Sequence, residues 1–315
     1  MERRFPLRPF SRMHHQTLTP SCILSRLATT LALLVLPCAA YALSDAAASP
    51  PMSASEPESA HTPGAHAEAL RRAHRRQLQE HLEVPEEELR GTCRFESDIT
   101  TLPPHGVVAL TFDDGPEPGH TEAILEVLTR RKVPATFFLI AEKARVHPEL
   151  VEKMLALPGA VVGNHTWSHP NFHDIPVDGQ LAEIDHADAL LRPQLDARPL
   201  FRYPYGNASC EANAHVRTLG YHIVGWHVDS CDWAFDGPEG LTAHEALSCG
   251  VLPAFRHDFL GHIVSGVHAH SGGIVLMHET QRNTVGNLDS LIGRLQDEGY
   301  RFTTPEAAEF DSSLR

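Results

Sequence analysis

The stretch from residue 107 to residue 116, VVALTFDDGP, constrains this chain more than any other. An apolar run that ends in two adjacent carboxylates and a Gly-Pro pair is typical of a buried strand that delivers acidic side chains to the edge of a sheet. Asp113 and Asp114 repel each other at this spacing unless a proton or a cation lies with them. A bound metal, with one acid as ligand and the other as base, would relieve that repulsion. A buried strand followed by an ordinary polar turn explains the same ten residues, so other parts of the chain must decide.

From residue 106 onward, short apolar runs alternate with amphipathic stretches. We expect strands at 107–112, 135–140, 161–163, 200–202, 222–226, 274–277 and 300–302. We expect helices at 121–131, 148–157, 177–191, 212–219, around 255–267 and at 285–298. Such alternation predicts parallel strands joined by right-handed helical crossovers. Six or more units in about 200 residues predict an α/β fold of the distorted or incomplete (β/α) barrel type, with its chemistry where strands end and loops begin.

A pair of histidines follows the expected strand at 161–163. His165 and His169 are four residues apart, and on a helical turn both imidazoles would lie on one side. Such a pair is weak evidence in a chain with 22 histidines, but its place at a strand end makes it more informative. Two imidazoles and one aspartate make an open three-ligand site that suits zinc or a similar divalent ion.

Five stretches, in this order, resemble the motifs of the polysaccharide deacetylase family, carbohydrate esterase family four. They are TFDDGP at 111–116, HTWSHP at 165–170, RYPYG at 202–206, DSCDW at 229–233 and IVLMH at 274–278. Five motifs in one order are far more specific than any single one. The resemblance covers about residues 105–305, marks the chain as a secreted, bacterial-type member, and implies the distorted barrel that the alternation also predicts.

The resemblance implies where the chemistry lies. It makes Asp114, His165 and His169 the metal ligands, Asp113 the general base and His278 the general acid. A metal-bound water is expected to attack an N-acetyl group, with Asp113 taking its proton and His278 protonating the departing amine. The expected cofactor is one divalent ion, most simply zinc, with cobalt or nickel as alternatives.

Supporting roles follow from the same resemblance. Arg202 is expected to pair with Asp113, and Asp232 to pair with His278 and raise its pKa, with Asp229 as the alternative partner.

Three more residues complete the expected site. The backbone N–H of Tyr205 is expected to stabilise the oxyanion. Trp233 and Leu276 are expected to line a small pocket for the acetyl methyl group, although an ordinary core position explains both nearly as well and is compatible with that role.

The N-terminal part has the composition of exported proteins. Arginines precede an apolar run at 27–36, and Ala-Tyr-Ala at 40–42 has the form of a cleavage site. We therefore expect a signal peptide at 1–42, a disordered linker at 43–64, a helical or irregular extension at 65–104 and the catalytic domain at 105–310. We therefore expect the protein to be secreted or to lie in the periplasm or cell envelope, with no stable membrane span after the signal peptide is cleaved.

The net charge of the chain bears on which classes of molecule it can bind. The chain carries −14, and the first 42 residues contribute +4, so the remainder carries −18. Such an acidic chain is a poor candidate for binding nucleic acid. The expected substrate is an N-acetylglucosamine-containing polysaccharide: peptidoglycan, a chitin-like oligomer or poly-N-acetylglucosamine. O-deacetylation of xylan or other carbohydrate esters, and a non-catalytic carbohydrate-binding envelope protein, remain alternatives.

Four cysteines lie beyond the expected signal peptide: Cys93, Cys210, Cys231 and Cys249. In an oxidising compartment they allow two disulfides in three alternative pairings, among which the sequence does not choose.

Overall fold

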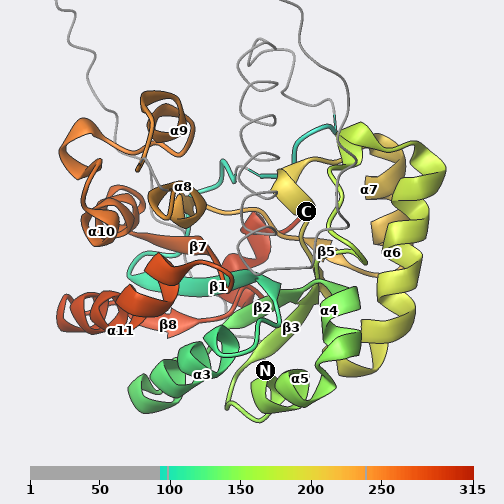
Figure 1. Ribbon diagram of the computed structural model, residues 1–315, viewed down its shortest axis with the longest axis horizontal. Coiled ribbons are helices and arrows are strands. Elements are labelled where there is room, and N and C mark those ends of the chain that lie inside the picture. Colours follow the sequence, from blue (N-terminus) through green and yellow to red (C-terminus); the bar gives the residue numbers. More distant parts are fainter. Residues whose placement is uncertain (1–92, 98, 238–239) are drawn as a thin grey trace, which may run out of the picture. The chain divides into compact units, whose positions relative to one another are not determined.

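The computed structural model describes residues 93–97, 99–237 and 240–315 (Figure 1). The expected signal peptide, the linker and most of the helical extension lie outside the described residues.

One parallel sheet organises the described part of the chain. Its strands are β1 (Val107–Gly115), β2 (Thr136–Leu139), β3 (Val161–Asn164), β4 (Leu200–Phe201), β5 (His222–Ile223), β6 (Val228–Asp229), β7 (Gly272–His278) and β8 (Arg301–Thr303). They are ordered β5-β4-β3-β2-β1-β7-β6, and β8 also pairs with β1. Every strand pair is parallel, and no pairing between β5 and β6 is described. This arrangement confirms the predicted α/β fold with an incomplete (β/α) barrel.

Helices connect the strands and surround the sheet (Figure 1). They are α3 (His120–Arg131), α4 (Ala141–Val146), α5 (Pro148–Leu155), α6 (Val177–Leu191), α7 (Cys210–Thr218), α8 (Asp232–Phe235), α9 (Ala243–Ser248), α10 (Phe259–His270) and α11 (Arg282–Asp297). None of the helices described combines the length and the apolar character that crossing a bilayer requires.

The longer elements agree with the predicted ranges to within a few residues, apart from α10, which starts later than expected. Helix α3, for example, buries Ile124, Leu125 and Leu128, the apolar face that its sequence predicts. The elements that the sequence analysis did not predict are short: α4 and α9 have six residues each, α8 has four and β6 has two. Segments this short do not complete enough turns or alternations to show a period.

The core lies between the strands and the helices that pack on them. Phe112 of β1 and Phe137 of β2 are fully buried, and their rings stack with centroids 5.5 Å apart. Truncating such a side chain to alanine typically costs about 3–5 kcal/mol. Strand β1 also pairs with β2, β7 and β8, so the residues at its carboxyl end have a rigid base.

Two disulfides settle the question that the sequence left open. Cys93 pairs with Cys210, and Cys231 pairs with Cys249. The first joins the start of the described chain to the N-terminus of α7. The second joins the residue before α8 to the residue after α9.

Candidate active site

Strand β1 delivers both acids of the first motif to the carboxyl edge of the sheet. Its register with β2 shifts between Asp113 and Gly115, and Asp114 has a φ of 70°, in the left-handed region. A bulge of this kind redirects a side chain that would otherwise point to the opposite face. The chain direction therefore changes at Asp114. The strand itself continues through Gly115 and ends directly before Pro116.

The two histidines of the second motif lie on an irregular loop after β3. The expected helical turn was wrong: no helix is assigned from His165 to His169, and Thr166 and His169 have φ values of 70° and 65°. Asn164 Oδ1 accepts a hydrogen bond from the Thr166 backbone N–H at 2.8 Å, and Thr166 Oγ1 accepts one from the His169 N–H at 3.2 Å. These side-chain bonds hold the loop in a shape that brings the imidazole rings within 4.9 Å of each other, centroid to centroid.

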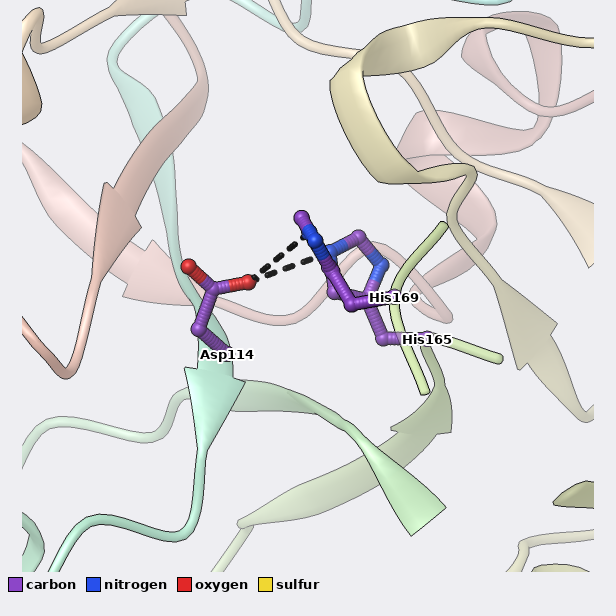
Figure 2. A group of neighbouring side chains, drawn as sticks. All are labelled: Asp114, His165 and His169. Atoms are coloured by element: carbon purple, nitrogen blue, oxygen red, sulfur yellow. Dashed lines mark ion pairs between the residues drawn. The ribbon is translucent and has the colours of Figure 1, made fainter. Parts of the chain in front are cut away.

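Asp114, His165 and His169 meet in one buried cluster (Figure 2). One carboxylate oxygen of Asp114 faces both rings, 3.1 Å from His169 Nε2 and 3.5 Å from His165 Nε2. Candidate ligand atoms of all three residues lie within 4.8 Å of one another, and among the described residues no other such group of His, Cys, Asp and Glu is found. His165 Nδ1 donates to the Arg202 carbonyl at 2.8 Å, which leaves Nε2 as a lone-pair donor for an ion.

The electrostatics of the cluster favour an ionised carboxylate. Burial alone would raise the pKa of Asp114, but the imidazoles of His169 and His165 hold it well below its usual range. One anionic oxygen ligand and two imidazoles match the donors of a divalent transition-metal site.

Arg202, at the end of β4, holds the second acid. Its Nη1 donates to Asp113 Oδ1 and to Thr111 Oγ1, both at 2.8 Å, and the guanidinium is only 1% exposed. Its other donors reach the carbonyls of Val224 at 3.1 Å and Gly225 at 3.0 Å. All of these partners are backbone or core atoms, so the guanidinium has a fixed position and holds Oδ1 of Asp113 in place. The other oxygen of Asp113, Oδ2, points toward the histidine cluster and lies 3.6 Å from His165 Nε2.

His278 ends β7, directly beside Asp113 in the sheet register. Its Nδ1 donates to Asp232 Oδ1 and its backbone N–H to Asp232 Oδ2, both at 2.7 Å. Burial lowers the pKa of His278, but the carboxylates of Asp232, Asp114 and Asp113 outweigh burial and raise it to about 10. The imidazole is therefore charged at neutral pH in this charge environment. Asp229, the alternative partner, instead accepts from the Cys231 N–H at 2.8 Å.

The remaining expected residues lie around this centre. Tyr205 occupies a turn with a φ of 59°, and its ring meets that of His169 edge-on at 4.8 Å. Trp233 and Leu276 are almost wholly buried, so both are core residues whatever else they do.

Glu279 is a residue that the sequence analysis missed. It follows His278, is fully buried, and accepts a hydrogen bond from Thr121 Oγ1. Burial raises its pKa to about 8. Its backbone N–H donates to the Asp113 carbonyl at 3.0 Å, and its carboxyl group packs against Gly115. The only sequence signal was an acid immediately after the histidine of an apolar strand.

Comparisons with known proteins agree with this geometry. Residues 101–224 match the family model described as polysaccharide deacetylase. The chain is 34% identical over 202 residues to a peptidoglycan-N-acetylglucosamine deacetylase of Bacillus cereus, covering 62% of this chain and 66% of that protein. It is 31% identical over 222 residues to a chitooligosaccharide deacetylase of Sinorhizobium fredii, covering 64% of this chain and 93% of that protein. This chain belongs to the polysaccharide deacetylase family.

Solved structures of the family share the fold. The Bc1960 peptidoglycan N-acetylglucosamine deacetylase is 28% identical, with a TM-score of 0.54 over 70% of this chain and 95% of that one. Coverage of the relatives is uneven, since this chain spans slightly less than two thirds of the Bacillus cereus protein but nearly all of the Sinorhizobium one.

Proposed function

We propose that this protein is a metal-dependent hydrolase that removes N-acetyl groups from a polysaccharide containing N-acetylglucosamine. The observation that carries the proposal is the meeting of three buried units at one edge of the sheet. They are the Asp114–His165–His169 cluster, the Arg202–Asp113 pair and the Asp232–His278 pair. A protein that only binds carbohydrate has no use for an aimed base and a charged acid in the same place.

The proposed ligands are Asp114, His165 and His169, and the proposed ion is zinc, with cobalt or nickel as substitutes. When bound, such an ion supplies Lewis-acid polarisation of a water and of the acetyl carbonyl.

The remaining chemistry belongs to the chain itself. Asp113, oriented by Arg202, takes a proton from the attacking water as the new C–O bond forms. The backbone N–H of Tyr205 stabilises the negative charge that develops on the carbonyl oxygen. His278, charged because Asp232 lies against it, gives its Nε2 proton to the nitrogen as the C–N bond breaks. Acetate and a free amine leave.

The substrate assignment rests on the relatives, whose names specify peptidoglycan and chitooligosaccharides. We therefore propose peptidoglycan or a chitin-like oligomer as the polymer and the cell envelope as the place of action. Amide and ester hydrolysis pass through the same oxyanion, so a side-by-side assay must choose between them.

Acetate release tests the proposal. Purified protein, stripped with a chelator and then supplied with zinc, cobalt or nickel, is incubated with N-acetylglucosamine oligomers, peptidoglycan and acetylated xylan. We expect metal-dependent release from the amino-sugar polymers, and none from the His165→Ala/His169→Ala double variant. Release from xylan alone would support the ester alternative. Binding to the polymers without release from any would support the non-catalytic alternative.

A further inference from the structure

Resting on the proposed function, we propose that residues 93–97, which we call the N-terminal brace, are a positioning part of the active site. They lie before the segment that matches the family model and before the expected catalytic domain. The brace holds the turn that presents the Tyr205 N–H and, on its other side, the carbonyl that orients Arg202.

The brace pairs directly with the turn that carries Tyr205. The Glu96 N–H donates to the Gly206 carbonyl, and the Ala208 N–H donates to the Arg94 carbonyl, both at 2.7 Å. Tyr205 and Gly206 have φ values of 59° and 69°, so two consecutive residues are in the left-handed region. A non-glycine residue in this region is held there only by its surroundings. The two backbone bonds to the brace hold the turn at Gly206 and two residues later at Ala208.

Ser97 contacts both the turn that carries Tyr205 and the backbone segment that orients Arg202. A Cβ on Gly206 would lie 2.5 Å from the Ser97 Cβ, and one on Gly225 would overlap the Ser97 carbonyl oxygen. That carbonyl accepts from the Trp226 N–H at 2.8 Å. The Gly225 carbonyl in turn accepts from Arg202 Nη2 at 3.0 Å. Displacing Ser97 would therefore loosen both the turn and the backbone that orients Arg202.

Two anchors fix the brace from outside the site. Cys93 is bonded to Cys210 at the start of α7. The Glu96 carboxylate is buried, accepts from Asn213 Nδ2 at 2.6 Å, and pairs with the guanidinium of Arg315. These anchors touch none of the proposed metal ligands or the acid, so their loss should reach the chemistry through the brace alone.

Four variants of the full chain test the proposal. Glu96→Ala removes the buried carboxylate, and Cys93→Ser/Cys210→Ser removes the disulfide. Glu96→Gln keeps an acceptor for Asn213 and serves as the conservative rescue. Glu309→Ala is the matched control, because it removes a carboxylate that pairs with Arg301 away from the site. Each variant is measured for kcat, KM, zinc affinity and amide hydrogen exchange at residues 203–208.

We expect Glu96→Ala and the double cysteine variant to lower kcat roughly tenfold, since a small misplacement of a catalytic group has effects of this size or larger. KM and zinc affinity should stay near wild-type values, while exchange at 203–208 becomes faster. Glu96→Gln should recover most of the lost kcat, and Glu309→Ala should match wild type.

Faster exchange with an unchanged kcat would overturn the proposal, because the brace would then be structural only. Unchanged exchange would overturn it as well. If Glu96→Ala fails to fold, the double cysteine variant still decides. If wild type releases no acetate from any substrate, the proposed function fails, and the exchange measurement still tests whether the brace holds the turn.

Discussion

Replacing Asp232 with asparagine should disable His278 while leaving the fold in place. The Asp232 carboxylate is fully buried and accepts from the His278 ring, the His278 backbone N–H, Thr284 Oγ1 at 2.6 Å and the Trp233 N–H at 2.8 Å. Asparagine has nearly the same shape but only one acceptor oxygen and no charge. The imidazole would keep its place in the sheet and lose its anionic partner.

The size of the expected effect follows from the groups that raise and lower the pKa of His278. Burial lowers its pKa, and Asp232 is the largest of the groups that raise it to about 10. Removing an opposite charge at this distance typically lowers a pKa by about 1–3 units. The alkaline limit of kcat should therefore move to lower pH, because the acid is active only while protonated. A pKa lowered by about three units, from about 10 to about 7, would leave roughly half of the acid protonated at pH 7 but only about 1% at pH 9. At pH 9, kcat should therefore fall by up to roughly a hundredfold, which corresponds to about 2.7 kcal/mol of transition-state stabilisation.

The assay is acetate release from an N-acetylglucosamine oligomer between about pH 6 and about pH 11, a range that covers the wild-type His278 pKa of about 10 and the lowered pKa expected for the variant. His278→Ala and the double variant Asp232→Asn/His278→Ala complete a cycle. If Asp232 acts through His278, the double variant is no slower than His278→Ala alone. Thr284→Val, which removes one hydrogen bond and keeps the carboxylate, should cost far less. Losses that multiply in the double variant, or a wild-type pH profile for Asp232→Asn, would refute the reasoning.

Three further changes test other parts of the structure. Asp113→Asn should abolish turnover yet retain metal in an elemental analysis, because the proposed ligands are untouched; loss of metal would place Asp113 among them. Gly115→Ala should lower the free energy of unfolding by about 1–3 kcal/mol in a denaturant titration, because the new Cβ overlaps the buried Glu279 carboxyl; unchanged stability would mean that Glu279 moves freely. His227 should contribute to acid sensitivity, since its Nδ1 accepts from the Ile274 N–H at 3.0 Å and burial lowers its pKa from 6.5 to about 4. This contribution to the free energy of unfolding is at most roughly 3 kcal/mol; it is fully present above pH 6.5 and is lost as the pH falls to about 4. His227→Gln should therefore flatten the plot of unfolding free energy against pH in this range, and an unchanged slope would refute the prediction.

The sequence determined the parts of this protein that depend on local pattern. The apolar run before Asp113 predicts a buried strand, and the alternation after it predicts the parallel sheet, because both patterns are visible in neighbouring residues. The five motifs predicted which side chains would gather, and the structure does bring Asp114, His165 and His169 into one cluster. Their roles in metal binding and catalysis remain predictions.

Only the tertiary structure decided how these side chains meet. The left-handed conformations of Asp114 and His169 were not predicted, because non-glycine residues adopt them only where the surrounding structure holds them there. The same is true of the two disulfide pairings and of Ser97, which packs against glycines more than 100 positions later in the chain. A sequence specifies which side chains are available and the hydrophobic period of each segment. Which segments touch is decided by the packing of the whole sheet, and the active site is built from those contacts.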